Sequence, residues 1–315
     1  MSINTHICAV CTYLPTNIIT NHDLAIHLDT SDTWITQRTG IKQRHKAKLN
    51  ENSFTMALTC CQKLLEEQNI QVESITGILV ATSTPNQMIP SLACQLCNNL
   101  GIKNAFAVDI NAACSGFLYA LESAHYRIQQ LPQQRILVIG VDMMSSVVDW
   151  SDRSTAVLFG DGAGVVLLEG LKASSGLIDI QCKSAAYGAE KLKIPASHNA
   201  KITMQGRDVF RFAVSHLVQS AQELIAKNAL TINDINWVIP HQANLRILQS
   251  VAERLQLPKN QIIQTVQNHA NTSAASIPLA LRYALDKQKI KSGDLILLQA
   301  FGAGYTWGAA LYKWQ

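Results

Sequence analysis

The sequence has few charged residues and lacks the segments that mark disordered, membrane-spanning or nucleic-acid-binding proteins. Asp, Glu, Lys and Arg make up only 15% of the 315 residues, and no long charged block or low-complexity tract is present. Extensive disorder is therefore excluded. No stretch reaches the ~18 consecutive apolar residues that a bilayer-spanning helix requires. The net charge of +4 is small and no basic run is interleaved with aromatic residues, so we expect neither nucleic acid nor a membrane among the partners.

Two further absences concern secretion and metal binding. The first 13 residues have no basic start followed by an apolar core, so we expect no signal peptide and a cytoplasmic location. The eight cysteines are scattered and do not suggest a disulfide framework. Cys94 and Cys97 have CxxC spacing, but neither a second pair nor suitably spaced histidines accompany them. We interpret them as one face of a helix and expect no metal site.

The apolar residues that are present follow an alternating pattern of strands and helices. They make up 48% of the chain, which is enough for one large or two medium-sized domains. The pattern predicts strands over residues 75–82, 105–110, 135–140, 235–240 and 294–300, and helices over residues 90–100, 114–130, 244–255 and 271–285. This alternation indicates an α/β fold with largely buried sheets.

The two halves of the chain end in a similar way, with a Phe-Gly pair, further glycines and a strand. Residues 159–168 read FGDGAGVVLL and residues 301–312 read FGAGYTWGAALY. We interpret this as a weak internal duplication that divides the chain into residues 1–170 and 171–315. Two such halves, packed together, would bring equivalent strand ends and helix starts to a shared site.

The glycines of the first half do not fit a dinucleotide-binding fingerprint. A strand rather than a helix follows Gly160, Gly162 and Gly164, whereas the fingerprint needs a helix there. We expect these glycines to form a tight bend that uses glycine's access to positive φ.

Three segments carry residues that are suited to nucleophilic chemistry. Cys114 lies where a predicted helix begins, and the N–H groups and partial positive charge of a helix start favour a thiolate. His241 follows a predicted strand, at the carboxyl end where α/β proteins usually bind ligands. Asn271 lies at a loop-to-helix entry. Each residue has a structural alternative: a small core cysteine, a hydrogen-bonded structural histidine and a helix N-cap, respectively.

Together these segments resemble the beta-ketoacyl-acyl-carrier-protein synthase III family, the initiating condensing enzymes of fatty-acid synthesis. The resemblance runs nearly end to end and rests on residues 30–41 (TSDTWITQRTGI), 152–153, 159–164, 206–210, 241–246, 271–276 and 301–308. It implies the thiolase fold, a five-layered αβαβα sandwich of two similar halves, normally as a homodimer. It also implies the reaction, in which an acyl-CoA starter condenses with malonyl-acyl carrier protein without a metal or organic cofactor.

The resemblance assigns catalytic roles to five residues. Cys114, His241 and Asn271 would form the catalytic triad. An asparagine in the third role is typical of the initiating type and its polyketide-synthase relatives, whereas the elongating enzymes use two histidines. The backbone N–H groups of Cys114 and Ala303 would bind the oxyanion, and Phe301 would shield the site from water.

The resemblance also assigns binding roles. Trp34 and Arg153 would grip the CoA adenine from both faces, as a flat ring and a guanidinium plane can do. Arg38 would contact the phosphate end of CoA. Arg211 and Arg246 would meet the acidic carrier protein.

Several positions depart from the family pattern. Ala303 and Ala270 stand where glycine is usual. At Ala303 the backbone would be strained if that position needs positive φ. Tyr305 replaces a common phenylalanine, and residues 188–203 form a shorter segment than usual. Ile89 stands where acetyl-preferring relatives often have a phenylalanine that reaches into the partner subunit's acyl pocket. We therefore expect a longer or branched starter.

Other functions are compatible with parts of this pattern. A specialised-metabolism (polyketide-type) condensing or acyl-transfer enzyme would keep the same triad and use another acceptor, and it remains the alternative. A non-catalytic partner subunit would usually lose the nucleophile or the histidine. A thiolase proper would need a second cysteine near the C-terminus, and none follows Cys182.

Overall fold

Two β-sheets form the framework of the protein. The computed structural model describes residues 3–197 and 199–315. The first sheet has the strand order β1-β7-β6-β4-β5, and the second has the order β11-β12-β13-β8. The strands of the first sheet are β1 (Ile3–Tyr13), β4 (Gly77–Ala81), β5 (Phe106–Ile110), β6 (Arg135–Met143) and β7 (Asp161–Lys172); those of the second are β8 (Gly176–Gly188), β11 (Trp237–Pro240), β12 (Leu295–Gly302) and β13 (Gly304–Lys313).

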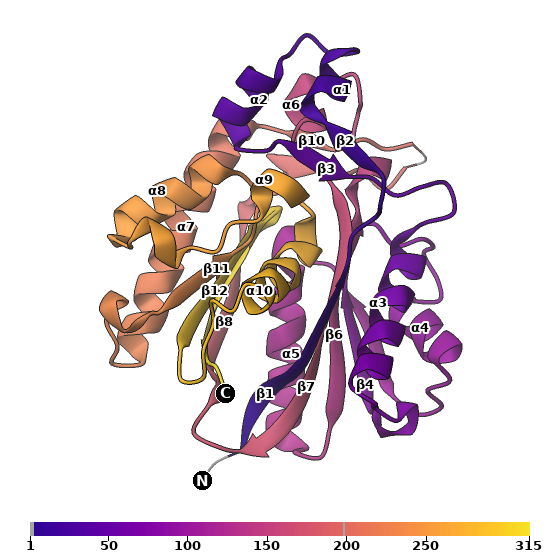
Figure 1. The fold of residues 1–315 in the computed structure, drawn as a ribbon, viewed down its shortest axis with the longest axis vertical. Helices are drawn as coiled ribbons and strands as arrows, with labels where there is room; N and C mark the ends of the chain where they lie inside the picture. Colours follow the sequence, from indigo (N-terminus) through magenta and orange to yellow (C-terminus); the bar gives the residue numbers. More distant parts are fainter. Residues whose placement is uncertain (1–2, 198) are drawn as a thin grey trace.

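Helices cover and separate the two sheets (Figure 1). On the outer face of the first sheet lie α3 (Ser53–Glu67) and α4 (Leu92–Leu100), and on the outer face of the second lie α7 (Gly206–Lys227) and α8 (Leu245–Leu255). Between the sheets run α5 (Gly116–Gln130) and α10 (Ser276–Asp286), whose buried residues contact both sheets. The result is the αβαβα sandwich that the family resemblance implies.

Shorter elements gather at one end of the sandwich (Figure 1). They include α1 (Asn21–Ala25), α2 (Asp32–Thr39), α6 (Arg153–Ala156), α9 (Val266–His269) and the small strands β2 (Ile18–Thr20), β3 (Gln43–His45), β9 (Leu192–Lys193) and β10 (Thr203–Met204). Strands β4, β5 and β6 are mutually parallel, as are β11 and β12. The residues that follow these strands line one cavity, described below.

The two sheets repeat one arrangement, in agreement with the duplication inferred from sequence. In each sheet a parallel pair is followed by an antiparallel strand, β4-β6-β7 in the first and β11-β12-β13 in the second. Strand β7 ends at Lys172, and β8, which belongs to the second sheet, begins at Gly176. The boundary between residues 170 and 171 itself stays a prediction.

Both central helices begin later than the sequence predicts. Each is preceded by a short 3-10 turn, η2 (Ala113–Ser115) before α5 and η6 (Ser273–Ala275) before α10. The first residue of each turn has positive φ, 48° at Ala113 and 51° at Ser273. A residue with positive φ interrupts a right-handed helix of L-residues, so α10 does not extend back through Ser273 to Asn271. Cys114 lies within the turn η2, before α5 begins.

The expected bend at the glycines of residues 160–164 is wrong. Gly162 and Gly164 lie within the extended strand β7, and positive φ occurs at other glycines. These two residues are small because α10 packs directly on the strand: a Cβ on Gly164 would lie 2.7 Å from the ring of Pro278. The glycines therefore provide a close helix–sheet approach rather than a turn.

The two alanines that replace family glycines differ in their backbone. Ala270 has φ 58° and ψ −159°, a region that only glycine adopts without strain. Next to Ala303, the positive φ (130°) belongs to the following residue, Gly304. An alanine is therefore tolerated at position 303. The strain considered at Ala303 is therefore absent, and the strain at Ala270 was not predicted from the sequence.

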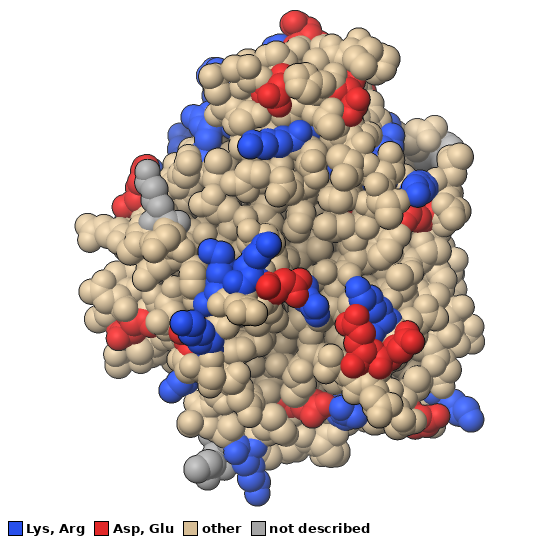
Figure 2. Space-filling model, viewed as in Figure 1, with Lys and Arg blue, Asp and Glu red and all other residues tan. Residues whose placement is uncertain are grey.

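Figure 2 shows small groups of basic side chains beside acidic ones on one face, separated by uncharged surface. In the described parts of the chain, no helix is both long and apolar enough to cross a bilayer. Within the same residues, no group of three His, Cys, Asp or Glu side chains is arranged to hold a metal ion.

Candidate active site

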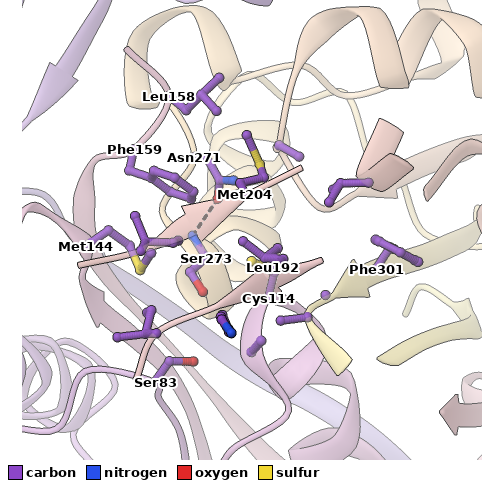
Figure 3. Close-up of a pocket in the computed structure, with 18 of the residues that line it drawn as sticks. Ser83, Cys114, Met144, Leu158, Phe159, Leu192, Met204, Asn271, Ser273 and Phe301 are labelled. Carbon is purple, nitrogen blue, oxygen red and sulfur yellow. Dashed lines mark hydrogen bonds between the residues drawn. The ribbon is translucent and has the colours of Figure 1, made fainter. Parts of the chain in front are cut away.

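One cavity of about 1500 Å³ lies where the two halves of the chain meet. Its walls include the residues that follow the parallel strands of both sheets, as expected for α/β proteins. Most residues singled out from sequence line it: Trp34, Arg38, Cys114, Arg153, His241, Arg246, Asn271, Phe301 and Ala303. Arg211 and Ile89 do not. Figure 3 shows Cys114 and Asn271 in this cavity, with the apolar side chains of Met144, Phe159 and Leu192 nearby.

Cys114 lies in the turn η2 against the hairpin that carries Ala303. A Cβ on Gly302 would lie 2.9 Å from the backbone nitrogen of Cys114, so only glycine allows this approach. The Ser115 hydroxyl donates to Thr306 Oγ1 at 2.7 Å, which in turn bonds the Ala303 carbonyl at 3.0 Å. These contacts hold the turn η2, which carries Cys114, next to Ala303, the second residue predicted to bind the oxyanion.

The expectation that the helix start favours a Cys114 thiolate is wrong for the unliganded protein. Burial raises the pKa of the Cys114 thiol to about 12, and the nearby Asp142 carboxylate adds to this rise. The Ser273 hydroxyl and the turn's own N–H lower the pKa but do not offset burial. The thiol form therefore dominates at rest, and the proton must leave during the reaction.

Sequence reasoning missed Ser273 and Asp142. Ser273 lines the cavity with Cys114, and its hydroxyl lowers the pKa of both the Cys114 thiol and the Asp142 carboxyl group. Asp142 is fully buried and accepts backbone N–H groups from Ser83 at 2.7 Å and Ala274 at 3.2 Å. It joins the cavity loop after β4 to the turn η6. The available signal was an acid at the end of a buried strand, which needs several donors to remain there.

His241 follows β11, and its backbone N–H donates to the Gln299 carbonyl at 2.7 Å. Its Nδ1 lies 2.6 Å from Ser276 Oγ. Burial lowers the pKa of His241 to about 3, so the imidazole is neutral at physiological pH. A neutral imidazole can donate or accept one hydrogen bond through the nitrogen that remains for the cavity.

Asn271 is held by backbone groups of both halves. Its N–H donates to Leu158 O at 2.9 Å, and its carbonyl accepts from Gly160 N at 3.0 Å. Its side-chain Oδ1 accepts the Ser273 N–H at 2.9 Å (Figure 3). The amide nitrogen is left as the donor that can reach a ligand. The N-cap alternative is wrong, because the N-cap residues of η6 and α10 are Thr272 and Ala275.

At the cavity entrance, Arg153 lies directly on the ring of Trp34. The guanidinium carbon is 4.9 Å from the ring centroid, and that of Arg38 is 6.0 Å away. Two stacking contacts need about 7 Å. The pair is therefore closed, and Arg153 must move before a base can lie between them.

The residues predicted to meet partners occupy different places. The Arg246 guanidinium lies over the Phe210 ring at 5.7 Å, on the cavity rim, where Arg207 also lines the wall. Arg211 is outside the cavity, with its side chain 73% exposed and paired with Asp208 at 3.5 Å. Ile89 is 85% exposed and does not line the cavity of its own chain.

The raised pKa of Cys114 predicts how its reactivity depends on pH. Because only the thiolate is alkylated, we expect the iodoacetamide rate at Cys114 to rise about tenfold per pH unit between pH 7 and 9. Mass spectrometry of the Cys114 peptide follows this rate, with the exposed Cys94 as an internal control for the reagent. A plateau reached near neutral pH would show that the helix start outweighs burial.

Comparison with known proteins identifies the family. Residues 108–186 match the model of 3-oxoacyl-[acyl-carrier-protein (ACP)] synthase III, and residues 225–314 match that of its C-terminal part. The beta-ketoacyl-[acyl-carrier-protein] synthase III of Wolbachia pipientis wMel is 46% identical over 310 residues, which is 95% of this chain and 96% of that protein.

Solved structures give the same result. The 3-oxoacyl-[acyl-carrier-protein] synthase III of Aquifex aeolicus matches with a TM-score of 0.95 and 42% identity, over 98% of this chain and 100% of that one. A priming β-ketosynthase from a polyketide biosynthetic pathway matches with a TM-score of 0.94 but only 28% identity, over 100% of this chain and 98% of that one. The chain belongs to the 3-oxoacyl-[acyl-carrier-protein] synthase III family.

Proposed function

We propose that this protein is an acyltransferase that condenses an acyl-CoA starter with malonyl-acyl carrier protein and so initiates fatty-acid synthesis. The observation that carries this proposal is the convergence of Cys114, His241 and Asn271 from both halves on one cavity, in a chain whose relatives at 44–46% identity are named beta-ketoacyl-[acyl-carrier-protein] synthase III. The steps below use no metal or organic cofactor.

In the first step, Cys114 is acylated. Its sulfur attacks the thioester carbonyl of acyl-CoA, and the thiol proton leaves with the CoA thiolate. The oxyanion that forms is stabilised by the N–H groups of Cys114 and Ala303. The close packing of Gly302 on the Cys114 nitrogen supports this role, because it fixes the relative position of the two donors.

In the second step, malonyl-acyl carrier protein replaces CoA. His241 and Asn271 each donate a hydrogen bond to the malonyl thioester oxygen. Loss of carbon dioxide leaves an enolate, which these two donors stabilise. The enolate carbon attacks the acyl carbonyl, the C–S bond to Cys114 breaks, and a 3-oxoacyl carrier protein is released.

Residues around the triad bind the substrates. Trp34 and Arg153 would separate to admit the adenine of CoA, and Arg38 would meet its phosphates. Phe301 would shield the acyl-enzyme from water. The apolar walls seen in Figure 3 suit an acyl chain, and with isoleucine at position 89 we propose a starter longer than acetyl or branched. The cytoplasmic location stays a prediction from sequence.

Acyl loading tests the nucleophile and the starter together. Incubation with acetyl-, butyryl-, isovaleryl- or octanoyl-CoA should add the mass of one acyl group to the intact protein, and Cys114→Ala should abolish this gain. We expect butyryl- to octanoyl-CoA or isovaleryl-CoA to exceed acetyl-CoA in kcat/KM. A preference for acetyl-CoA would contradict the proposed starter class.

Discharge of the loaded enzyme separates this function from its alternative. Malonyl-acyl carrier protein should remove the acyl group as a 3-oxoacyl product. An enzyme that is loaded but not discharged by it would be the specialised-metabolism type with another acceptor. No loading by any acyl-CoA would contradict the proposal that the starter is a CoA thioester.

The rim position of Arg246 predicts a selective effect of charge reversal. Arg246→Glu should slow discharge by malonyl-acyl carrier protein about tenfold, because it repels an acidic partner, and should spare acyl loading from CoA. Arg254→Glu, at the other end of α8 and outside the cavity wall, is the matched control. Equal loss in both half-reactions, or no loss in either, would refute a docking role for Arg246.

We also propose that the chain forms a homodimer through β5. This strand is at the edge of the first sheet, and apolar side chains are exposed beside it, with Phe106 42%, Met88 87% and Ile89 85% exposed. An apolar edge strand is a template for pairing with another strand. Such pairing would bring Ile89 toward the partner's cavity. Sedimentation equilibrium at micromolar concentration should give the mass of two chains, and the mass of one chain would contradict the proposal.

A further inference from the structure

The hydrogen bonds of Ser276 define the protonation of His241. Ser276 is the first residue of α10 and is 2% exposed, and the adjacent His241 is 4% exposed. Ser276 Oγ lies 2.6 Å from His241 Nδ1 and accepts the backbone N–H of Gln242 at 3.3 Å. Among the described residues, Nδ1 is the only nitrogen of this ring with a hydrogen-bond partner, so Nε2 is left for the cavity that His241 lines.

Two protonation patterns are compatible with a neutral imidazole, and they differ in cost. If the Ser276 hydroxyl donates to Nδ1, then Oγ accepts from Gln242, and all three groups are satisfied. If Nδ1–H donates to Oγ instead, the hydroxyl proton has no acceptor within the part of the chain that the structure describes. A buried donor without an acceptor loses its full solvation energy. The first pattern is therefore favoured.

The backbone beside His241 is rigid enough to maintain this pattern. The side chain of Gln242 is fully buried and donates to Pro240 O at 2.7 Å. Its Oε1 accepts the Thr265 N–H at 2.8 Å. These bonds fix the Gln242 N–H, which occupies one lone pair of Ser276 Oγ and thereby directs the hydroxyl proton toward Nδ1.

We propose that Ser276 is a positioning residue that holds His241 in the tautomer with its proton on Nε2, as a hydrogen-bond donor to the malonyl thioester oxygen. The chemical consequence rests on the proposed function, whereas the tautomer itself does not. Both hydrogen-bond donors are then oriented by serines of one segment, Ser273 in η6 and Ser276 at the start of α10. The Ser273 N–H turns the Asn271 amide nitrogen toward the ligand, and the Ser276 hydroxyl puts the imidazole proton toward it.

The tautomer can be read directly in the full-length protein. NMR of protein labelled with ¹⁵N in the imidazole rings, with His241→Asn to assign the signals, should show Nε2 protonated and Nδ1 unprotonated near pH 7.5. Ser276→Ala should produce an Nδ1–H population or exchange between tautomers. A proton on Nδ1 of the unaltered protein would overturn the proposal, whatever the activity.

Half-reaction kinetics test the functional consequence. Ser276→Ala should lower the rate constant for malonyl decarboxylation about tenfold, the bias that one net hydrogen bond provides. The KM of this variant for malonyl-acyl carrier protein should stay within about twofold of the value for the unaltered protein. The rate of Cys114 acylation should also stay within about twofold, because acylation does not use the His241 donor. Ser276→Thr, which keeps a hydroxyl, should restore the rate.

The control separates this effect from a loss of stability. Ser220→Ala removes another buried hydroxyl, on α7, that bonds only the Leu217 carbonyl among the described residues. It should change neither half-reaction. Equal slowing of acylation and decarboxylation by Ser276→Ala would overturn the positioning role. A correct tautomer in a protein without condensing activity would instead reject the proposed function and leave the tautomer assignment standing.

Discussion

The close backbone contact between the two halves is the constraint on which the catalytic centre depends. Each sheet supports the turn that belongs to the other half. A Cβ on Gly140 of β6 would lie 2.2 Å from the carbonyl oxygen of Ala274 in η6, and a Cβ on Gly302 of β12 would lie 2.9 Å from the nitrogen of Cys114 in η2. A side chain at either glycine would force the halves apart. These two contacts, one from each sheet to the turn of the other half, therefore set the distance between Cys114 and the other two triad residues, His241 and Asn271.

The two titratable residues of the catalytic triad are uncharged at rest, and burial is the reason. The Cys114 thiol and the His241 imidazole are both neutral, since desolvation raises the pKa of the first and lowers that of the second. Oriented donors surround them instead. Negative charge arises only during the reaction, first on the acyl oxygen and then on the enolate. Hydrogen-bond donors that are already oriented can stabilise these transient anions without any reorganisation of the site or of water.

Much of the fold could be predicted from sequence because its signals are local. Apolar runs marked the strands, and the positions of Cys114 and His241 after strands placed them at one edge of the sheets. The limits were equally physical. The bend predicted at Gly164 was wrong because the Pro278 ring that requires the glycine is distant in sequence. The thiolate prediction failed because the burial of Cys114 is produced by the other half. Ser276 was missed because its partner lies 35 positions away.

The contact between Arg153 and Trp34 has a consequence for exchange at the entrance. A base that stacks on Trp34 must displace the guanidinium that already covers the ring, so the protein supplies an internal competitor for the same surface. At an exposed site such a contact is worth about 0.5–1 kcal/mol. Opening the pair costs that contact, and a new contact between Arg153 and the base offsets part of the cost. When the nucleotide leaves, the Arg153 guanidinium returns to the Trp34 ring. In the proposed reaction, CoA must leave before malonyl-acyl carrier protein enters through the same opening. The return of Arg153 to the Trp34 ring therefore favours release of CoA.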